Sequence, residues 1–169
     1  MPDYIFDTTV LSNLAAVGRL DLLEKRYRET GLTTVKVSDE LRRGLQAGYG
    51  YLEDALRQIQ TITPGGWLRG AVPESAAEHR LRGEFDLLLD PGEASCLALA
   101  ISRGLVLVTD DLAARRLAQE RDVLLTGTVG ILVALVRDDT LSLDEGNAML
   151  AEMIERRYRS PVDSLDEFI

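Results

Sequence analysis

A run of five residues at positions 105–109, LVLVT, constrains the fold of this chain more than any other segment. It is almost entirely apolar, with no polar residue alternating along it, and this predicts a strand buried on both faces. Strands of this kind are typical of parallel sheets that carry helices on both sides. One helical pattern ends just before the run, at Gly104, and another begins just after it, at Asp110-Asp111. The segment therefore predicts a βαβ architecture around a central parallel sheet.

The rest of the chain repeats this alternation of strand and helix. Further strands are predicted at residues 4–7, 32–37, 59–63 and 122–125. Helices are predicted after Asp7, from Ser38, after Asp90, after Asp111, and at about 19–28, 51–58, 74–88, 127–137 and 142–157. Residues 64–74 have the least regular pattern, and a long loop or lid is predicted there. Without a linker, a repeat or a break in composition, one domain is expected over residues 1–169, with a core over about 3–135, an amphipathic C-terminal helix and an acidic tail.

The composition narrows the classes of function. The 169 residues include 19 Lys and Arg against 28 Asp and Glu, a net charge of −9. Because Lys and Arg supply most of the non-specific affinity for nucleic acid, contact with RNA would have to come from a local patch. The single cysteine excludes an internal disulfide and a cysteine-based zinc site. The N-terminus has no secretory pattern and no apolar run approaches the roughly 18 residues of a membrane span, so a cytoplasmic protein without membrane contact is expected.

Acidic side chains stand where predicted strands pass into helices: Asp7, Glu40, Glu93, Asp110 and Asp111. In a parallel α/β fold these turns open onto one edge of the sheet, which would bring the carboxylates together in space. Clustered like charges raise one another's pKa unless a cation lies among them. Mg²⁺ and Mn²⁺ take oxygen ligands and keep several waters, so a few carboxylates are sufficient. The pattern predicts a divalent metal site.

Each of these acids also has a structural explanation, because Asp and Glu are favoured in the first turn of helices. Asp90 fits an N-cap with Pro91 after it, and Glu93 then fits the capping-box partner. Two features favour the metal site. The threonines that follow Asp7 are able to cap the helix in its place, and one acid would be sufficient where Asp110 and Asp111 both stand.

Other chemistries have weaker support. The single histidine, His79, lies in a charged stretch and is expected at the surface, and Cys96 lies on an apolar helix and is expected in the core. No Walker A sequence occurs, and no GxGxxG follows the first strand. Thr126-Gly127-Thr128 is interpreted either as a site for phosphate or metal-bound water, or as a tight turn with a threonine cap.

The ordered set of motifs YIFDTTVLSNLAAVGRLDLL, VSDEL, GEASCLALAISRGLVLVTDDLAARRLA and TGTVGIL resembles the PIN-domain family over about residues 3–135. The resemblance is to the prokaryotic branch with a GE-type third motif, related to VapC-type toxins. It implies an α/β fold, a three-layer Rossmann-like sandwich with a central parallel sheet flanked by helices. It also implies an acidic cluster that binds Mg²⁺ or Mn²⁺ for cleavage of RNA.

The family's site residues can be carried over one by one. Asp7 matches the first acid, Glu40 the second, and Glu93 stands where many relatives have an aspartate. Asp110 or Asp111 matches the last acid, and Thr128 matches a supporting position. Asp7, Glu93, Asp110 and Asp111 are the expected metal ligands. The arginines nearest the acids in sequence are hypothesised to bind the RNA backbone: Arg42, Arg43, Arg115 and Arg116.

The resemblance further implies an endoribonuclease that is the toxin of a type II toxin–antitoxin pair, acting on single-stranded or structured RNA. A small antitoxin partner and a homodimer are expected. Two alternatives stay open at this point. One is a phosphatase-like enzyme with an aspartyl nucleophile, although the second acid typical of such enzymes is missing after Asp7-Thr8-Thr9. The other is a non-catalytic PIN-like binding module.

Overall fold

The structure is a computed structural model that describes residues 2–169, and its centre is a five-stranded sheet. The strands are β1 (Tyr4–Phe6), β2 (Gly31–Thr34), β3 (Arg69–Ala71), β4 (Val106–Val108) and β5 (Leu125–Thr126). They lie in the order β3-β2-β1-β4-β5, and every neighbouring pair is parallel. All three residues of β4 are buried. The sheet predicted from the LVLVT run is thus confirmed.

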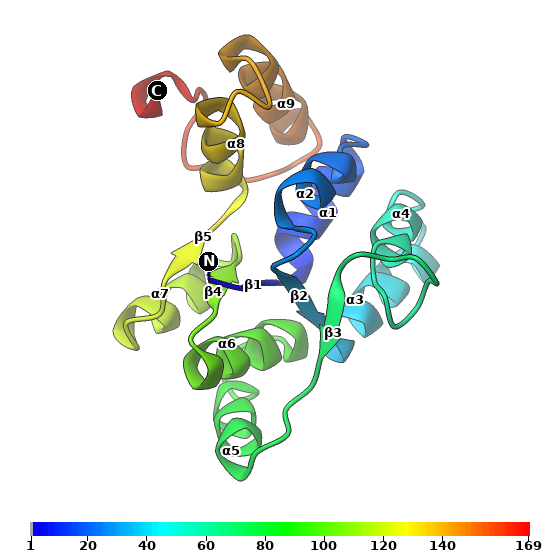
Figure 1. The fold of residues 1–169 in the computed structure, drawn as a ribbon, viewed down its shortest axis with the longest axis vertical. Coiled ribbons are helices and arrows are strands. Elements are labelled where there is room, and N and C mark those ends of the chain that lie inside the picture. Colours follow the sequence, from blue (N-terminus) through cyan, green and yellow to red (C-terminus); the bar gives the residue numbers. More distant parts are fainter. Residues whose placement is uncertain (1) are drawn as a thin grey trace.

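Helices cover both faces of this sheet and form a three-layer α/β fold (Figure 1). The upper layer in that view contains α1 (Thr8–Ala16), α2 (Leu20–Tyr27), α8 (Thr128–Arg137) and α9 (Leu143–Glu155). The lower layer contains α5 (Ala76–Phe85), α6 (Pro91–Arg103) and α7 (Leu112–Glu120). Beside the β3 edge lie α3 (Val35–Gln46) and α4 (Leu52–Arg57), and a short 3₁₀ turn, η1 (Asp166–Phe168), ends the chain. None of the helices in residues 2–169 is long and apolar enough to cross a bilayer.

The hydrophobic core is continuous from the sheet into both helical layers. Phe6 of β1 packs edge-on against Tyr27 and Trp67, with ring centroids 5.3 and 6.3 Å apart. Six consecutive residues of α6, from Cys96 to Ile101, pack in or against the core. Cys96 is fully buried, as expected from its apolar helix, and His79 is exposed, as expected from its charged surroundings.

Three predicted strands differ from the structure. The stretch at 32–37 is a strand only to Thr34, because the Thr34 hydroxyl accepts from the Val37 amide and begins α3 there, ahead of Ser38. Residues 59–63 form no strand, and only Ile59 makes an isolated bridge to Leu68. The strand expected at 122–125 is shifted to β5.

The segment 64–74 was expected to be an irregular loop or lid, and this is wrong in part, because it contains β3. The three residues of β3 pair in register with Leu32, Thr33 and Thr34 of β2. The pairing supplies the order that the local sequence, with a glycine at its centre, does not predict. Figure 1 shows the strand running beside β2 at the edge of the sheet.

The strand order creates a switch point between β1 and β4. From β1 the chain moves outward to β2 and β3, whereas β4 and β5 lie on the other side of β1. In open parallel sheets the crevice for a ligand lies at such a point, beyond the carboxyl ends of the strands. Asp7 follows β1 directly, and Thr109 and Asp110 follow β4. The fold therefore places the first and last predicted acids at the crevice.

Candidate functional site

Asp7 is fully buried at the end of β1, where its carboxylate is the N-cap of α1. Its Oδ1 accepts hydrogen bonds from the Thr9 amide at 3.0 Å and from the Thr9 hydroxyl at 2.7 Å, and its Oδ2 accepts from the Thr109 hydroxyl. The expectation that the threonines cap α1 in its place is wrong. Burial, together with the negative charge of Asp110, raises the pKa of Asp7 to about 7.

Asp110 and Asp111 point to different partners. Asp111 is the N-cap of α7 and accepts from the Ala114 amide at 2.8 Å. Asp110 is not the N-cap of α7. Its oxygens accept hydrogen bonds from the Thr128 amide at 2.8 Å, from the Thr128 hydroxyl, and from the Asn13 side chain at 3.0 Å. Both aspartates line the same pocket, and they differ in what holds them: Asp110 is held by Thr128 and Asn13, and Asp111 by the first turn of α7.

Glu40 reaches the same region from α3. Its Oε2 accepts from the Thr8 hydroxyl, and its Oε1 accepts from the Gly92 amide at 2.7 Å. A Cβ on Gly92 would lie 2.4 Å from Glu40 Oε2, so only glycine leaves room for this contact. The glycine of the GE motif therefore has a physical role: without a side chain at position 92, the Glu40 carboxylate of α3 can contact the backbone of α6.

Glu93 is half-buried in the first turn of α6, and its carboxylate accepts from the Asp90 amide at 3.3 Å, as a capping-box partner. Burial raises its pKa to about 8, assisted by the negative charges of Asp111, Asp7 and Asp90. The charges that act on Glu93 and on Asp7 show that the acids predicted from separate motifs are electrostatic neighbours in the fold.

Within the part of the chain that the structure describes, these carboxylates form no ion pair. Among residues 2–169, twelve ion pairs join Lys or Arg to Asp or Glu, and none involves Asp7, Glu40, Glu93, Asp110 or Asp111. A divalent cation would supply the missing positive charge, and carboxylate oxygens are the donors that Mg²⁺ and Mn²⁺ prefer. The donor set therefore fits such an ion in its chemistry.

The arrangement does not form a closed cage. In the described part of the chain no group of three or more Asp, Glu, His or Cys side chains is arranged to hold a metal ion directly. Mg²⁺ usually keeps several waters and binds through one or two carboxylates. The residues consequently fit a hydrated cation held from one side by the carboxylates, and not an ion enclosed by protein ligands.

A pocket of about 840 Å³ opens at Asp110 and Asp111, and Asp7, Glu40 and Glu93 are not among its lining residues. It is lined by Asp110, Asp111 and Arg115, together with residues of α1, α8 and the segment after α9. Arg115 is half-buried, and its guanidinium donates to the Thr109 carbonyl at 2.8 Å. Arg42, Arg43 and Arg116 do not line the pocket, and Arg42 lies 3.7 Å from Asp39. Of the four arginines expected to bind RNA, only Arg115 is brought to the site.

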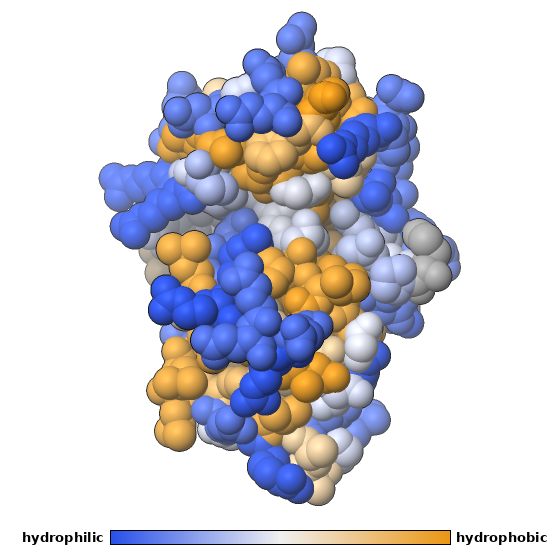
Figure 2. Space-filling view, turned by 90° about the vertical axis from the view of Figure 1, so that its left-hand side faces the viewer, coloured by the Kyte–Doolittle hydropathy of each residue, from blue (hydrophilic) through white to orange (hydrophobic). Residues whose placement is uncertain are grey.

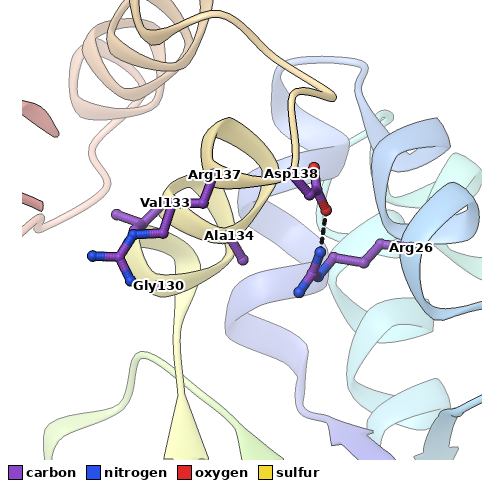
Figure 3. A pocket seen from close by; sticks show the side chains of 6 residues that line it. All are labelled: Arg26, Gly130, Val133, Ala134, Arg137 and Asp138. Carbon is purple, nitrogen blue, oxygen red and sulfur yellow. Dashed lines mark hydrogen bonds and ion pairs between the residues drawn. The ribbon is translucent and has the colours of Figure 1, made fainter. Parts of the chain in front are cut away.

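A second hollow, of about 340 Å³, lies between α2 and α8 and contains no free acid (Figure 3). Its one carboxylate, Asp138, is paired with Arg26 across the groove. Without an unpaired acid or nucleophile among its lining residues, this hollow offers no chemistry comparable to that of the first pocket.

The comparisons with known proteins agree with this geometry. The family model DUF3368, described as a PIN domain, matches residues 3–169. The chain belongs to the PIN-domain family. PIN domains are generally nucleases that use divalent metal ions.

Among solved structures, the crystal structure of PAE2754 from Pyrobaculum aerophilum is similar to this PIN domain. The TM-score is 0.55 at 22% identity, over 80% of this chain and 98% of that chain. At that identity the similarity shows a shared fold and nothing more. No curated protein matches the chain.

Sequence reasoning missed the residue that joins α1 to the last acid of the PIN domain. The Asn13 side chain donates to Asp110 Oδ2 at 3.0 Å and to the Thr128 hydroxyl at 3.1 Å. The sequence offers one sign of this role: Asn13 is a poor helix former, yet it stands within the predicted helix after Asp7. Thr109 was missed as well, because its place at the end of the predicted strand gives no sign that its hydroxyl donates to Asp7.

Proposed function

We propose that this PIN domain is a Mg²⁺- or Mn²⁺-dependent endoribonuclease that hydrolyses phosphodiester bonds of RNA. One observation carries the proposal: Asp7, which is fully buried, and Glu93, which is half-buried, have no ion-pair partner within residues 2–169, and burial and neighbouring negative charges raise their pKa values to about 7 and about 8. Such a cluster is electrostatically unfavourable without a cation, and perturbed acids in a crevice are typical of functional sites. Membership of a family that generally consists of metal-using nucleases supports the assignment.

Each acid has a distinct role in the proposed reaction. Asp110 is oriented by Asn13 and Thr128, and Asp7 is fixed by the hydroxyls of Thr9 and Thr109. The two carboxylates are near enough for the charge of Asp110 to raise the pKa of Asp7. Glu93 and Asp111 add negative charge on the α6 side. A bound divalent ion supplies Lewis acidity, activates water and neutralises the leaving oxygen. The chain itself supplies the positions of the donors.

Glu40 and Arg115 act around this centre. Glu40 is held from two sides, by Thr8 and Gly92, and from there it positions the attacking water. Arg115 holds the scissile strand, since its guanidinium lies in the pocket beside Asp110 and Asp111 without forming an ion pair among the described residues. Arginine pairs well with phosphate through its planar fork.

An aspartyl-nucleophile phosphatase is disfavoured by the state of Asp7. Both oxygens of Asp7 accept hydrogen bonds from threonine hydroxyls, and the second acid typical of such enzymes is missing after Asp7-Thr8-Thr9. A carboxylate in this position is suited to holding charge in a fixed place. Trapping of a phosphoenzyme with a phosphate analogue would revive that alternative.

The biological role is a finer proposal, which rests on the resemblance to VapC-type toxins. We propose that the chain is the toxin of a type II pair, that it forms a homodimer, and that a small antitoxin covers the acidic crevice. Expression should arrest growth, and co-expression of a short reading frame beside the gene should relieve the arrest. Arrest that is unchanged in an Asp110→Asn variant would contradict the toxin role.

The experiment that tests the enzymatic proposal is cleavage of a labelled RNA with Mn²⁺, with EDTA and with Asp110→Asn. Cleavage should require the metal and should fall by about 10²-fold or more in the variant, because the carboxylate at the crevice is lost. The exposed Asp163→Asn is the matched control and should leave cleavage unchanged. Cleavage that survives both EDTA and Asp110→Asn would refute the proposal.

A further inference from the structure

The segment that follows α9 returns across the mouth of the pocket. Arg157, Tyr158, Arg159 and Pro161 line the same cavity as Asp110 and Arg115, although they come from the opposite end of the chain. Residues 157–161, here called the C-terminal strap, lie outside the stretch that carries the PIN-domain motifs. No motif of the sequence assigns them a role.

The strap is held at both ends. At its start the amides of Arg157 and Tyr158 donate back to the Ile154 and Met153 carbonyls of α9, at 3.0 and 2.9 Å. Beyond it, Leu165 is fully buried, and its amide donates to the Asn147 side chain at 2.8 Å. The strap is therefore part of the folded wall of the pocket.

The backbone turns sharply to place this wall. Arg157 has φ 75°, the left-handed region that a residue with a Cβ adopts at a cost of about 1 kcal/mol. The turn brings the half-buried ring of Tyr158 over the crevice, where its hydroxyl donates to Asp110 Oδ1 at 3.3 Å. The conformation is that of an ordinary helix end, because the Arg157 and Tyr158 amides close the last turn of α9, and it sets the direction in which the strap leaves the helix.

The charge of the wall is opposite to that of the acids. Arg115, Arg157 and Arg159 all line the pocket, and within residues 2–169 none of the three forms an ion pair, although the molecule as a whole is strongly acidic. Arg156, the immediate neighbour, points away to Glu152 at 3.3 Å. The pocket thus has an acidic side at Asp110 and Asp111 and a basic, aromatic side at the strap.

We propose that the C-terminal strap is the strand-binding wall of the site: Arg157 and Arg159 bind backbone phosphates of a single-stranded nucleic acid, and an unpaired base stacks on Tyr158. This inference rests on the proposed nuclease function and names how its substrate is held. Unpaired bases stack on aromatic side chains while arginines follow the backbone, which is the usual composition of single-strand sites. A duplex would not expose a base to the ring.

The test is the affinity for a fluorescent single-stranded RNA in EDTA, where cleavage does not interfere, measured by anisotropy over a range of salt. The variant is Arg157→Ala with Arg159→Ala. The control, Arg156→Ala with Arg57→Ala, removes the same charge from arginines that pair elsewhere. The strap variant should bind roughly 10-fold or more weakly, and the slope of log K against log salt should fall by about 1.4, or 0.7 for each lost contact. The control should stay within about twofold of the wild type.

Tyr158→Phe and Tyr158→Leu separate the ring from the hydroxyl. The phenylalanine variant keeps stacking and should bind as the wild type does, whereas the leucine variant should bind roughly 5- to 100-fold more weakly. Equal losses in the strap and control variants, or displacement of the RNA by a poly-glutamate peptide at the same charge concentration, would overturn the proposal.

The outcomes for the strap and for the enzyme are distinguishable. Wild-type protein that neither binds RNA nor cleaves it with Mn²⁺ would refute the proposed function together with this inference. Wild-type cleavage with an unchanged affinity in the strap variant would overturn the strap alone.

Discussion

At the scale of single residues, the buried carboxylate of Asp7 lowers the stability of the metal-free fold at neutral pH. Its carboxylate is fully buried without a cationic partner among the described residues, and its pKa of about 7 lies far above the ordinary 3.8. A group whose pKa is raised in the folded state stabilises the fold below its unfolded pKa, and this contribution is lost as the pH rises through the folded value. The metal-free protein should therefore lose stability between about pH 4 and pH 7.

The corresponding prediction is that Asp7→Asn stabilises the metal-free protein while it impairs cleavage. Asparagine caps helices about as well as aspartate and stays neutral, so the Asn variant avoids the buried charge. In EDTA at pH 8 its melting temperature should exceed that of the wild type by roughly 3–6 °C, since 1 kcal/mol corresponds to about 2–4 °C in a chain of this size. The difference should vanish near pH 4, and Asp163→Asn should show none. A variant that melts below the wild type at pH 8 would contradict this account.

The sequence allowed the acids to be found but not all of their partners. Asp7 and Asp110 follow β1 and β4, as the local pattern predicts, whereas Glu40 lies inside α3 and Glu93 lies in the first turn of α6, which follows α5 and not a strand. The contacts that hold Asp110 come from Thr128 and from Asn13, and Asn13 is 97 positions from Asp110. A local sequence pattern cannot predict a contact between residues so far apart in the chain.

At the scale of elements, the approach of α6 to α3 depends on Gly92. An added Cβ would meet only the carboxylate end of Glu40, which is flexible, so Gly92→Ala should displace Glu40 and leave the fold intact. We expect cleavage to fall by roughly 10-fold or more, with a free energy of unfolding within about 1 kcal/mol of the wild type.

Gly83→Ala on α5 is the matched control, because nothing lies within 4 Å of its added Cβ. It should raise the free energy of unfolding by about 0.5–1 kcal/mol and leave cleavage unchanged. Equal effects of the two glycine substitutions on cleavage would show that the contact between Gly92 and Glu40 is unimportant.

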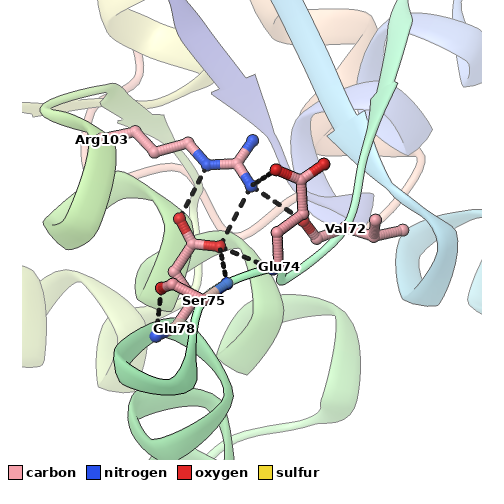
Figure 4. Close-up of polar contacts among 5 residues, drawn as sticks. All are labelled: Val72, Glu74, Ser75, Glu78 and Arg103. Atoms are coloured by element: carbon pink, nitrogen blue, oxygen red, sulfur yellow. Dashed lines mark hydrogen bonds and ion pairs between the residues drawn. The ribbon is translucent and has the colours of Figure 1, made fainter.

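An ion pair between the exposed Arg103 and the buried Glu78 joins α5 to the far end of α6 (Figure 4). Arg103 donates to both oxygens of Glu78, at 2.9 and 3.1 Å, and to the Val72 carbonyl at 2.8 Å. The Glu78 carboxylate also accepts from the Glu74 amide at 2.8 Å. These bonds fix the end of the segment in which a lid was expected, and they hold α5 against the helix that presents Glu93.

Glu78→Gln should cost about 1–3 kcal/mol at pH 7, because hydrogen bonds to the charged carboxylate are lost. The Arg103 guanidinium holds the pKa of Glu78 at about 2, below its ordinary 4.5, so the stabilisation is present above pH 4.5 and is lost as the pH falls toward 2. The exposed pair of Glu84 and Arg121 offers a control, Glu84→Gln, with an expected effect under about 0.5 kcal/mol. Chemical denaturation at several pH values from 7 down to 2 measures both. The difference between Glu78→Gln and the wild type should shrink steadily below pH 4.5, and a difference as large at pH 2 as at pH 7 would contradict the role of the charge.

Long, strongly patterned elements were predictable, and short ones were not. The apolar run at 105–109 and the helices from α5 onward are fixed by local composition. β3 has only three residues and exists because β2 supplies its hydrogen-bonding partner. The β-branched residues at 59–63 were a stronger local signal, but they had no neighbouring strand to extend.

At the scale of the whole molecule, charge is separated over the surface. The chain carries a net charge of −9, yet the unpaired arginines Arg115, Arg157 and Arg159 share one pocket with Asp110 and Asp111. Figure 2 shows hydrophobic groups between hydrophilic ones on the side of the molecule that carries α7 and β5. Leu112 of α7 and Leu124, next to β5, are 77% and 72% exposed. An overall negative charge repels nucleic acid at a distance, so binding of RNA has to be local and sensitive to salt.

The central claim is that the carboxylates at the switch point are completed by a divalent cation, and calorimetric titration with Mn²⁺ tests it most directly. At pH 7, Asp7 and Glu93 are partly protonated, because their pKa values are about 7 and about 8. A cation that binds among them has to displace these protons. Titrations in two buffers of different ionisation enthalpy should therefore report one site and a release of roughly one proton per ion, and Asp110→Asn should abolish the binding. Absence of Mn²⁺ binding at millimolar concentration, or binding without proton release, would contradict the account.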